Sequence, residues 1–568
     1  MALNGTVQGE IRKAFVYVQA RHVHYRVAGD GPPVVLLHDS PRSSLLHTRL
    51  LREFSDEFTV YALDTPGYGQ SDPLPQDPRP EIDDFGDALA ATLEALGLGR
   101  ATVYSYHTSS KIAVACALRH TDAIGQLLID GISVPSQLPE EEFVARYMSP
   151  FIPDASGAYL AEHWTKMRDL HRFFPWFDVG LAPRMPTDEP TPVQMHEYAL
   201  DLFSAGAHYS SAYSAAMRYA VRSKLAGLTV PTTVVARQND VLFGFLDAVE
   251  TLLPRCGRVE RLSIDDLEWR ATLRRLFRAT SPGPGAAAPK AVLPPGLVRR
   301  YQRVAGRDVL IREAGAGRST VVLHAPPGSS ADLTDVLGLL GESRRVWAPD
   351  LPGCNLSDAL PSDADVEAWV AFLIRAIDEA AITTFDLIAG GLSAPLALAL
   401  ADAAGTRVRG IVIDGGLVLD AERRKWLAES YAPRIVPTRY GTHFWEVFQR
   451  LRDEELQWPW FDGSAGARRG GGAGLNADRL HRRLVATVMQ PDTYAHACQV
   501  ALRIDPVPLL RRVGVRILFL ERPGDPYYAD VPASSALARE GSVLPTKQGL
   551  AGHIAAVKAF LDGKSQEA

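Results

Sequence analysis

The chain has 568 residues, 46% of them hydrophobic and 22% charged, with a formal net charge of -6 at pH 7. This length suits two domains, and the composition is that of a globular protein. The small negative charge argues against a nucleic-acid partner, and the sequence contains neither a signal-peptide pattern nor an apolar run of about 18 residues. We therefore expect a cytoplasmic protein without a membrane segment.

Cysteines and histidines give no metal or disulfide pattern. The four cysteines, at positions 116, 256, 354 and 498, lie singly, and no CxxC, HExxH or HxxxH spacing occurs. We expect buried thiols, no metal site and no cofactor.

In the first half, short β-type runs alternate with helical patterns. The runs are HVHYRVA, PVVLLH, FTVYALD, ATVYSY, IGQLLID and TTVVARQND. This alternation predicts βα units around a mostly parallel sheet. A long aromatic-rich helical segment, about residues 135–225, interrupts the sheet before its last strands and predicts a cap.

A proline-rich stretch follows. SPGPGAAAPKAVLPPG contains five prolines, which cannot continue a helix or a central strand. It predicts a linker at residues 281–297 between a first domain, 1–280, and a second domain, 298–568.

The second half repeats the first. His38 falls opposite His324 and Asp64 opposite Asp350, each 286 residues later, and Pro175-Trp176-Phe177-Asp178 recurs 284 residues later as Pro459-Trp460-Phe461-Asp462. Its β-type runs are DVLIREA, TVVLH, RRVWAPD, TFDLIAG, RGIVID and RILFLE, interrupted by a second helical segment at about 420–505. This pattern predicts a duplication.

Loops after these runs carry a family resemblance. LLHDSPRSS and LHAPPGSS resemble the HGxP loop of the α/β-hydrolase superfamily, and LDTPGYGQSD and DLPGCNLSD resemble its DxPGxGxS turn. The resemblance is to the capped branch that includes epoxide hydrolases, haloalkane dehalogenases and C–C bond hydrolases. It implies two tandem α/β-hydrolase folds, each with a mostly parallel eight-stranded sheet, flanking helices and an inserted cap, and a small-molecule substrate.

The family's nucleophile sits on a G-x-S-x-G elbow between a strand and a helix. On this template YSYHTSSKIAVACA places His107 at the nucleophile position, and IAGGLSAPLALALA places Gly391 there. Neither elbow then carries a serine, cysteine or aspartate. A shifted register would use Ser105, Ser109 or Ser110, but it would place Tyr106 or Lys111 where the turn tolerates little side chain.

Other members of a catalytic triad are expected after later strands. The acid position falls on Asp240 and Asp525, with Asp130 and Asp414 as alternatives one strand earlier, and helix capping is an equal explanation for each. The first half has no histidine after its last strand, where Asp265 and Asp266 stand instead. The second half has His553, close to its final helix.

Two further regions are candidates for the site. The loop of His38, Asp39 and Ser40, with the N–H of Thr108, would form an oxyanion hole, although an inward Asp39 carboxylate would oppose it. Trp164, Arg168 and Trp176 are candidate cap-pocket residues; core packing of the aromatic residues and a surface ion pair between Arg168 and Asp169 are the alternatives.

The sequence leads to two hypotheses. In the first, His107 acts with Asp240 or Asp130 on a small apolar or aromatic molecule, by non-serine hydrolysis through an activated water or by a cofactor-free lyase-type step. The second domain, with degenerate Gly391, Asp414, Asp525 and His553, would be structural. In the alternative, the protein is a catalytically inactive pseudo-hydrolase that binds a ligand or partner. We also expect the two domains to pair within the chain, and a further homo-oligomer is left open.

Overall fold

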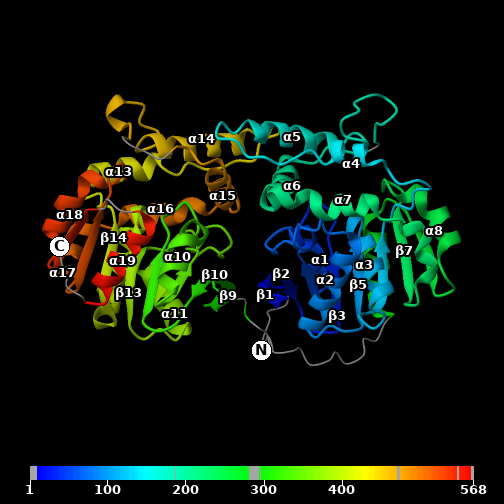
Figure 1. Cartoon of the computed structure of the whole chain (residues 1–568), viewed down its shortest axis with the longest axis horizontal. Helices are drawn as coiled ribbons and strands as arrows, with labels where there is room; N and C mark the ends of the chain where they lie inside the picture. Colours follow the sequence, from blue (N-terminus) through cyan, green and yellow to red (C-terminus); the bar gives the residue numbers. More distant parts are fainter. Residues whose placement is uncertain are drawn as a thin grey trace. The chain divides into compact units, whose positions relative to one another are not determined.

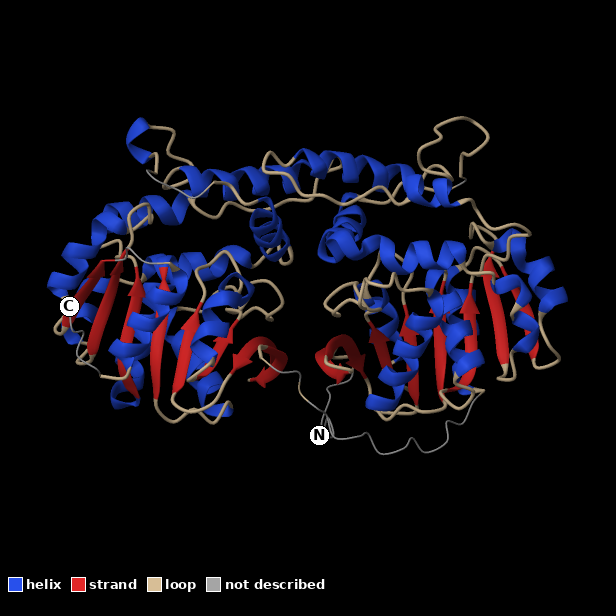
Figure 2. Cartoon of the chain, in the orientation of Figure 1, coloured by secondary structure: helices blue, strands red, loops and turns tan. Residues whose placement is uncertain are grey.

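The computed structural model describes residues 9–185, 187–279, 293, 296–469, 474–545 and 549–563. They form two compact units, Met1–Ile152 with Glu162–Pro294, and Pro153–Ala161 with Pro295–Ala568. Most of the expected linker at 281–297 lies outside the described residues. Each unit contains one eight-stranded sheet, drawn in red in Figure 2.

The first sheet has the strand order β1-β2-β4-β3-β5-β6-β7-β8. β2 is antiparallel to both of its neighbours, and the remaining neighbours run parallel. Its strands are β1 Arg12–Val18, β2 Arg21–Ala28, β3 Pro33–Leu37, β4 Thr59–Leu63, β5 Ala101–Tyr106, β6 Ile124–Asp130, β7 Thr232–Arg237 and β8 Gly257–Leu262.

Helices flank this sheet. Residues of α1 and α9 share one buried cluster with β3, β4 and β5, and α2 packs against α3. The flanking helices are α1 Thr48–Phe54, α2 Ile82–Ala95, α3 Thr108–Arg119, α8 Leu246–Leu252 and α9 Asp266–Arg278. Between β6 and β7 the chain forms the helices α4 Glu141–Tyr147, α5 Ala158–Leu170, α6 Pro192–Ala205 and α7 Ser211–Arg218.

The second sheet reproduces this order strand for strand, as β9-β10-β12-β11-β13-β14-β15-β16. Its strands are β9 Val298–Val304, β10 Arg307–Ala314, β11 Ser319–Leu323, β12 Arg345–Pro349, β13 Phe385–Gly390, β14 Val408–Asp414, β15 Arg516–Glu521 and β16 Gly541–Pro545. Its flanking helices are α10 Thr334–Gly341, α11 Val366–Glu379, α12 Ala394–Ala404, α18 Val531–Leu537 and α19 Leu550–Leu561. The insertion between β14 and β15 contains α13 Ala421–Ser430, α14 Thr442–Leu456, α15 Ala477–Val488, α16 Tyr494–Arg503 and α17 Pro506–Arg512 (Figure 1).

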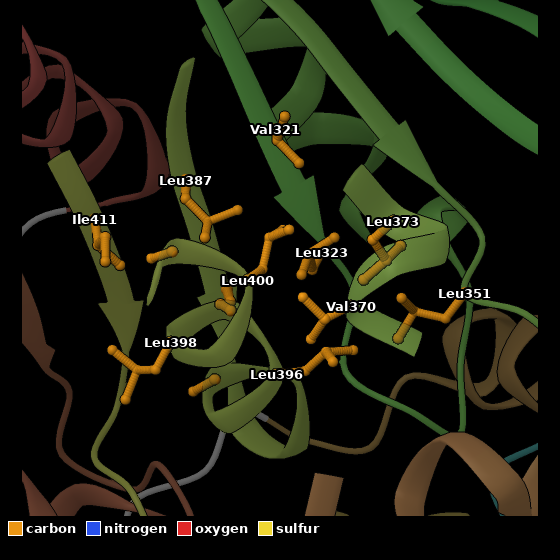
Figure 3. Packing of buried hydrophobic residues seen from close by; sticks show 14 of the residues in the cluster. Val321, Leu323, Leu351, Val370, Leu373, Leu387, Leu396, Leu398, Leu400 and Ile411 are labelled. Atoms are coloured by element: carbon orange, nitrogen blue, oxygen red, sulfur yellow. The ribbon is translucent and has the colours of Figure 1, made fainter. Parts of the chain in front are cut away.

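Continuous apolar runs become central strands because both faces of a parallel sheet are buried. Val321, Leu387 and Ile411 from β11, β13 and β14 belong to one buried cluster with residues of α11 and α12 (Figure 3). Val322, Ile388 and Val412, their neighbours in the strands, belong to another cluster with α10 and α19. The expected fold class, two tandem α/β-hydrolase folds with inserted helices, is confirmed.

The parallel strands bring three chain segments to one edge of the first sheet. Tyr106 at the end of β5 pairs with Asp130 at the end of β6, and Asp130 pairs with Val235 near the end of β7. Ligand sites of α/β sheets lie at the carboxyl ends of the strands. The residues that follow β5, β6 and β7 therefore form the candidate site.

Two expectations from composition can be compared with the structure. Cys116, Cys354 and Cys498 are buried thiols, but Cys256 is exposed, contrary to expectation, because it lies in the turn before the outermost strand β8. Within the described ranges, no helix is both long and apolar enough to cross a membrane.

Candidate active site

His107 occupies the tip of the turn between β5 and α3. Its backbone has φ 50° and ψ -106°, a conformation that residues other than glycine rarely adopt. The N–H of His107 donates to the carbonyl of Asp130 at 3.2 Å, and its own carbonyl accepts from Ser110 N–H at 3.0 Å. In the second unit Gly391 has φ 54° at the same place, after β13. Both turns thus have the sharp strand-to-helix geometry that lifts a side chain above the sheet.

The serines around His107 are engaged elsewhere. Ser105, Ser109 and Ser110 are all buried. Their hydroxyls donate to main-chain carbonyls, from Ser105 to Leu128 at 3.2 Å, from Ser109 to Leu37 at 3.1 Å and from Ser110 to Gly131 at 2.9 Å. Ser393 of the second unit makes the same bond to Leu323 at 3.1 Å. These hydroxyls stabilise the turn.

His107 forms an ion pair with Asp240, which follows β7. The two atoms His107 Nε2 and Asp240 Oδ2 are 2.9 Å apart, and the side chains are 22% and 6% exposed. The other carboxylate oxygen of Asp240 accepts from Leu242 N–H at 2.7 Å. Within the described part of the chain, no hydrogen-bond partner is found for the second ring nitrogen of His107, Nδ1. Asp240, not Asp130, is the carboxylate that bonds the imidazole.

Gly131 makes this contact possible. It has φ +74°, and a Cβ atom placed on it would lie 2.8 Å from His107 Cδ2 and 3.1 Å from Nε2. Real Cβ atoms essentially never approach another heavy atom to within 3.0 Å. The glycine of IDG therefore leaves the space into which the imidazole ring fits.

Surrounding charges favour the protonated form of His107. Burial, the largest single influence, lowers its pKa, but the hydrogen bond and charge of Asp240 and the charges of Asp39 and Asp130 outweigh it and raise the pKa above its ordinary value. For Asp240 burial acts to raise the pKa, and the bond to His107 reverses this and lowers it. Both pKa shifts mean that the charged forms of His107 and Asp240 stabilise each other.

Asp130 is held by two donors instead of by His107. Tyr104 Oη and Trp269 Nε1 donate to its Oδ2 at 2.8 and 2.7 Å. Its pKa is raised because burial outweighs these bonds. Asp130 is thus a buried residue beside His107, and the alternative in which the Asp130 carboxylate bonds the imidazole is wrong.

Sequence reasoning missed Trp269. It lies in α9, 284 residues before His553 in α19, so the offset that relates the two halves places tryptophan opposite the histidine. Asp265 and Asp266, which stand where a histidine was expected, have structural roles. Asp265 caps α9 by accepting from Leu267 N–H at 2.8 Å, and Asp266 pairs with Arg49 at 3.0 Å. Extending the repeat alignment to the final helices could have found Trp269.

The expected oxyanion loop is partly structural. His38 is not a pocket residue, because it is 1% exposed and its two ring nitrogens bond the backbone, Nε2 accepting from Thr65 N–H at 2.9 Å and Nδ1 donating to Asp39 O at 2.7 Å. Ser40 is also buried. Thr108 is the first residue of α3, where an N–H has no acceptor within the helix. Asp39 is half-buried, and its Oδ1 is buried and has no hydrogen-bond partner among the described residues.

The cap candidates are engaged in packing. Trp176 Nε1 donates to Tyr147 O at 3.0 Å, and Trp460 repeats this bond with Tyr431 O at 2.9 Å. Trp164 is only 5% exposed. Arg168 pairs with Glu189 at 3.2 Å. Trp176 and Glu189 both lie in the loop between α5 and α6, so these contacts depend on how that loop folds, which the helix pattern alone does not encode.

Two cap tyrosines and Arg42 lie near Asp39 instead, and none was a candidate. The charge of Asp39 raises the pKa of Tyr198 and Tyr213, in which burial is the largest influence. Arg42 Nε donates to Asp201 Oδ2 at 2.8 Å, and its guanidinium lies 5.2 Å from the centre of the Tyr198 ring.

In the second unit, the equivalent place is filled. Arg522 binds Asp414 through two hydrogen bonds of 2.8 and 2.7 Å and contacts Asp525 at 3.2 Å. A Cβ on Gly391 would lie 3.4 Å from the ring of Tyr527, which is 4% exposed and belongs to a buried aromatic cluster with Trp458. His553 is half-buried within α19. Gly391, Asp414, Asp525 and His553 therefore do not form a site like that of His107 and Asp240.

Other features give no alternative site. A small cavity is lined by Leu37, Leu63, Thr65, Phe85 and Ile112 among others, and neither His107 nor Asp240 contributes to it. In the portion of the chain that the structure describes, no three His, Cys, Asp or Glu side chains are grouped to hold a metal ion.

A family model and several known proteins are similar to parts of this chain. Residues 32–240 match the family model described as alpha/beta hydrolase fold. Haloalkane dehalogenase 2 of Mycobacterium tuberculosis (strain ATCC 25618 / H37Rv) is 25% identical over 239 residues, which are 41% of this chain and 78% of that protein. A haloalkane dehalogenase of Sphingobium indicum is 30% identical over 149 residues, 25% of this chain and 50% of that protein. A solved epoxide hydrolase from Vigna radiata is 17% identical with a TM-score of 0.37, covering 47% of this chain and 96% of that one. The first unit thus matches the α/β-hydrolase family over residues 32–240, and the second sheet has the same strand order as the first.

Proposed function

We propose that the first unit is a cofactor-free enzyme in which His107 and Asp240 form the catalytic dyad. The observation that carries this proposal is the position of His107 on the elbow tip, bonded through Nε2 to Asp240 at 2.9 Å. A carboxylate on one ring nitrogen fixes the tautomer and leaves the other nitrogen as the base. Neutral His107 would therefore hold its proton on Nε2 and present the lone pair of Nδ1.

The reaction that suits this dyad best is hydrolysis by an activated water. Nδ1 takes a proton from water while the water oxygen attacks an electrophilic carbon of the substrate, and the imidazolium then returns the proton to the leaving group. In this proposal the N–H of Thr108, at the start of α3, would donate to negative charge that develops on the substrate. A lyase-type step would use the same base on a substrate proton.

The substrate in this proposal is a small apolar or aromatic molecule. The relatives named above as haloalkane dehalogenases support a small organic substrate. The buried serines support a mechanism without a serine nucleophile, since each hydroxyl already donates to a carbonyl. The second unit would be structural, and its support is the pairing of Arg522 with Asp414 and the ring of Tyr527 beside Gly391.

The competing proposal is a pseudo-hydrolase that binds without turnover. The observation in its favour is Asp39, because a carboxylate beside the oxyanion position opposes negative charge on a substrate carbonyl.

Two variants test the proposal. His107→Ala removes the base, and loss of a general base typically lowers the rate by ~10²–10⁴. Gly391→Ala is the matched change in the second unit, where an added Cβ meets its nearest neighbours at 3.4 Å, so its activity should stay at the wild-type level. Rates are measured on a panel of esters, epoxides, haloalkanes and β-diketones, with folding checked by circular dichroism.

Each outcome is informative. Full activity of folded His107→Ala would move catalysis away from His107. Inactivity of the wild type on the whole panel would favour the pseudo-hydrolase. An organophosphonate that labels Ser105, Ser109 or Ser110, detected by mass spectrometry, would restore the serine mechanism.

A further inference from the structure

Asp39 reverses the polarity of the loop that would otherwise offer hydrogen-bond donors. It follows His38 directly, and its counterpart 286 residues later is Ala325, which has no polar side chain. The Oδ1 atom of Asp39 is buried and accepts no hydrogen bond from any described residue. A buried acceptor without a donor costs free energy, so such groups in native proteins are normally satisfied by a partner or ligand.

The nearby cation does not satisfy this oxygen. Arg42, three residues further on, donates through Nε to Asp201 Oδ2 at 2.8 Å, and Ser43 Oγ donates to Asp201 Oδ1 at 2.5 Å. Burial raises the pKa of Asp39; the charge of Arg42 acts in the opposite direction without outweighing it, and no hydrogen bond between the two side chains is found among the described residues. Asp39 thus keeps one oxygen for a donor from outside the protein.

The surroundings favour a positive charge at this place. Asp39, Asp130 and Asp240 all act on His107 in the direction that favours its cationic form. The ring of Tyr106 stacks on His107, with centroids 4.0 Å apart and planes inclined by 24°. The cap contributes Tyr198 and Tyr213, both close enough to Asp39 to feel its charge. Carboxylates next to aromatic faces are the combination that binds organic ammonium groups.

We propose that Asp39 binds a protonated amine of the substrate, so that the substrate of the His107–Asp240 dyad is a small organic cation with an apolar or aromatic body. That the bound cation is a substrate rests on the proposed function, whereas its binding does not require turnover. The ammonium N–H donates to Asp39 Oδ1, and the tyrosine rings contact the cationic group and the apolar body.

Three probes of similar shape test the charge. The full chain is titrated to millimolar concentrations with benzylammonium, benzyl alcohol and benzoate, and binding is followed by ligand-observed NMR. We expect benzylammonium to bind more tightly than benzyl alcohol, and benzoate more weakly than both. Asp39→Asn should weaken benzylammonium binding about 10- to 100-fold, the effect of one charge-assisted hydrogen bond, and leave benzyl alcohol unchanged.

Controls separate charge from folding. Asp122→Asn makes the same change of charge at a side chain that is 91% exposed and should leave all three affinities unchanged. Asp39→Ala, which installs the residue of the second unit, serves where Asp39→Asn does not fold. Preferential binding of benzoate, no binding of benzylammonium, or equal affinity in wild type and Asp39→Asn would each overturn the inference.

The inference and the proposed function fail in different ways. Ammonium binding that depends on Asp39, without any turnover that depends on His107, would retain the inference and remove the enzyme. His107-dependent turnover of neutral substrates without a preference for ammonium would retain the enzyme and remove the inference.

Discussion

Gly131→Ala should inactivate the dyad although neither His107 nor Asp240 is substituted. The new Cβ would lie 2.8 Å from His107 Cδ2, and an ordinary contact begins at 3.4 Å, so the ring must retreat by about 0.6 Å. Since Nε2 is the atom bonded to Asp240, a retreat directed away from that carboxylate takes the 2.9 Å bond to about 3.5 Å, the limit of a hydrogen bond. A displacement of about 1 Å in a catalytic group can cost ~10² in rate.

The backbone strain can be controlled separately. Alanine at the φ of +74° of Gly131 costs about 1–2 kcal/mol, which lowers the unfolding midpoint by about 2–8 °C. Gly415→Ala is the matched variant in the second unit, with φ +90° and a Cβ that would lie 2.7 Å from Asp525 Oδ1. It should lose comparable stability and no activity, because no imidazole is involved.

Two assays follow the dyad. The rate is measured on any substrate of the panel that the wild type consumes, and the pKa of His107 is measured by NMR titration of its ring, which needs no substrate. In Gly131→Ala the pKa should fall, because the bond to Asp240 raises it in the wild type. A folded Gly131→Ala protein with an unchanged rate and an unchanged pKa of His107 would refute the steric argument.

Three further predictions concern stability and pH. Asp240→Asn should lower the pKa of His107, because burial then acts without the opposing carboxylate. The stability advantage of the wild type should be largest between about pH 4 and 6.5, and should disappear as the pH rises through the raised pKa of His107 or falls through the lowered pKa of Asp240. A stability difference that does not vary with pH in urea titrations would contradict this. Trp269→Phe removes the 2.7 Å bond to the Asp130 carboxylate and should cost about 1.5–3 kcal/mol of unfolding free energy, whereas a loss under about 0.5 kcal/mol in urea unfolding would show that the bond is unimportant. Tyr527→Phe removes a buried hydroxyl that has no partner among the described residues, so the second unit should be as stable or more stable, and a loss above about 1 kcal/mol would show that the hydroxyl is satisfied.

The sequence by itself determined the fold class and the position of His107. Both follow from local pattern: short apolar runs between helical segments form a parallel sheet, and small residues around SYHTS form a sharp turn after β5. The second half repeats this pattern, and the second sheet accordingly has the same strand order as the first.

Only the tertiary structure decided which residues face His107. Asp240 is 133 residues away from it, and the choice between Asp240 and Asp130 depends on where the chain turns after β7 and on Trp269, which reaches Asp130 from the last helix. His38 looked like a site residue because its motif is local, but its ring bonds the next loop. Contacts of this kind depend on packing between distant segments, and periodicity and spacing describe only neighbours along the chain.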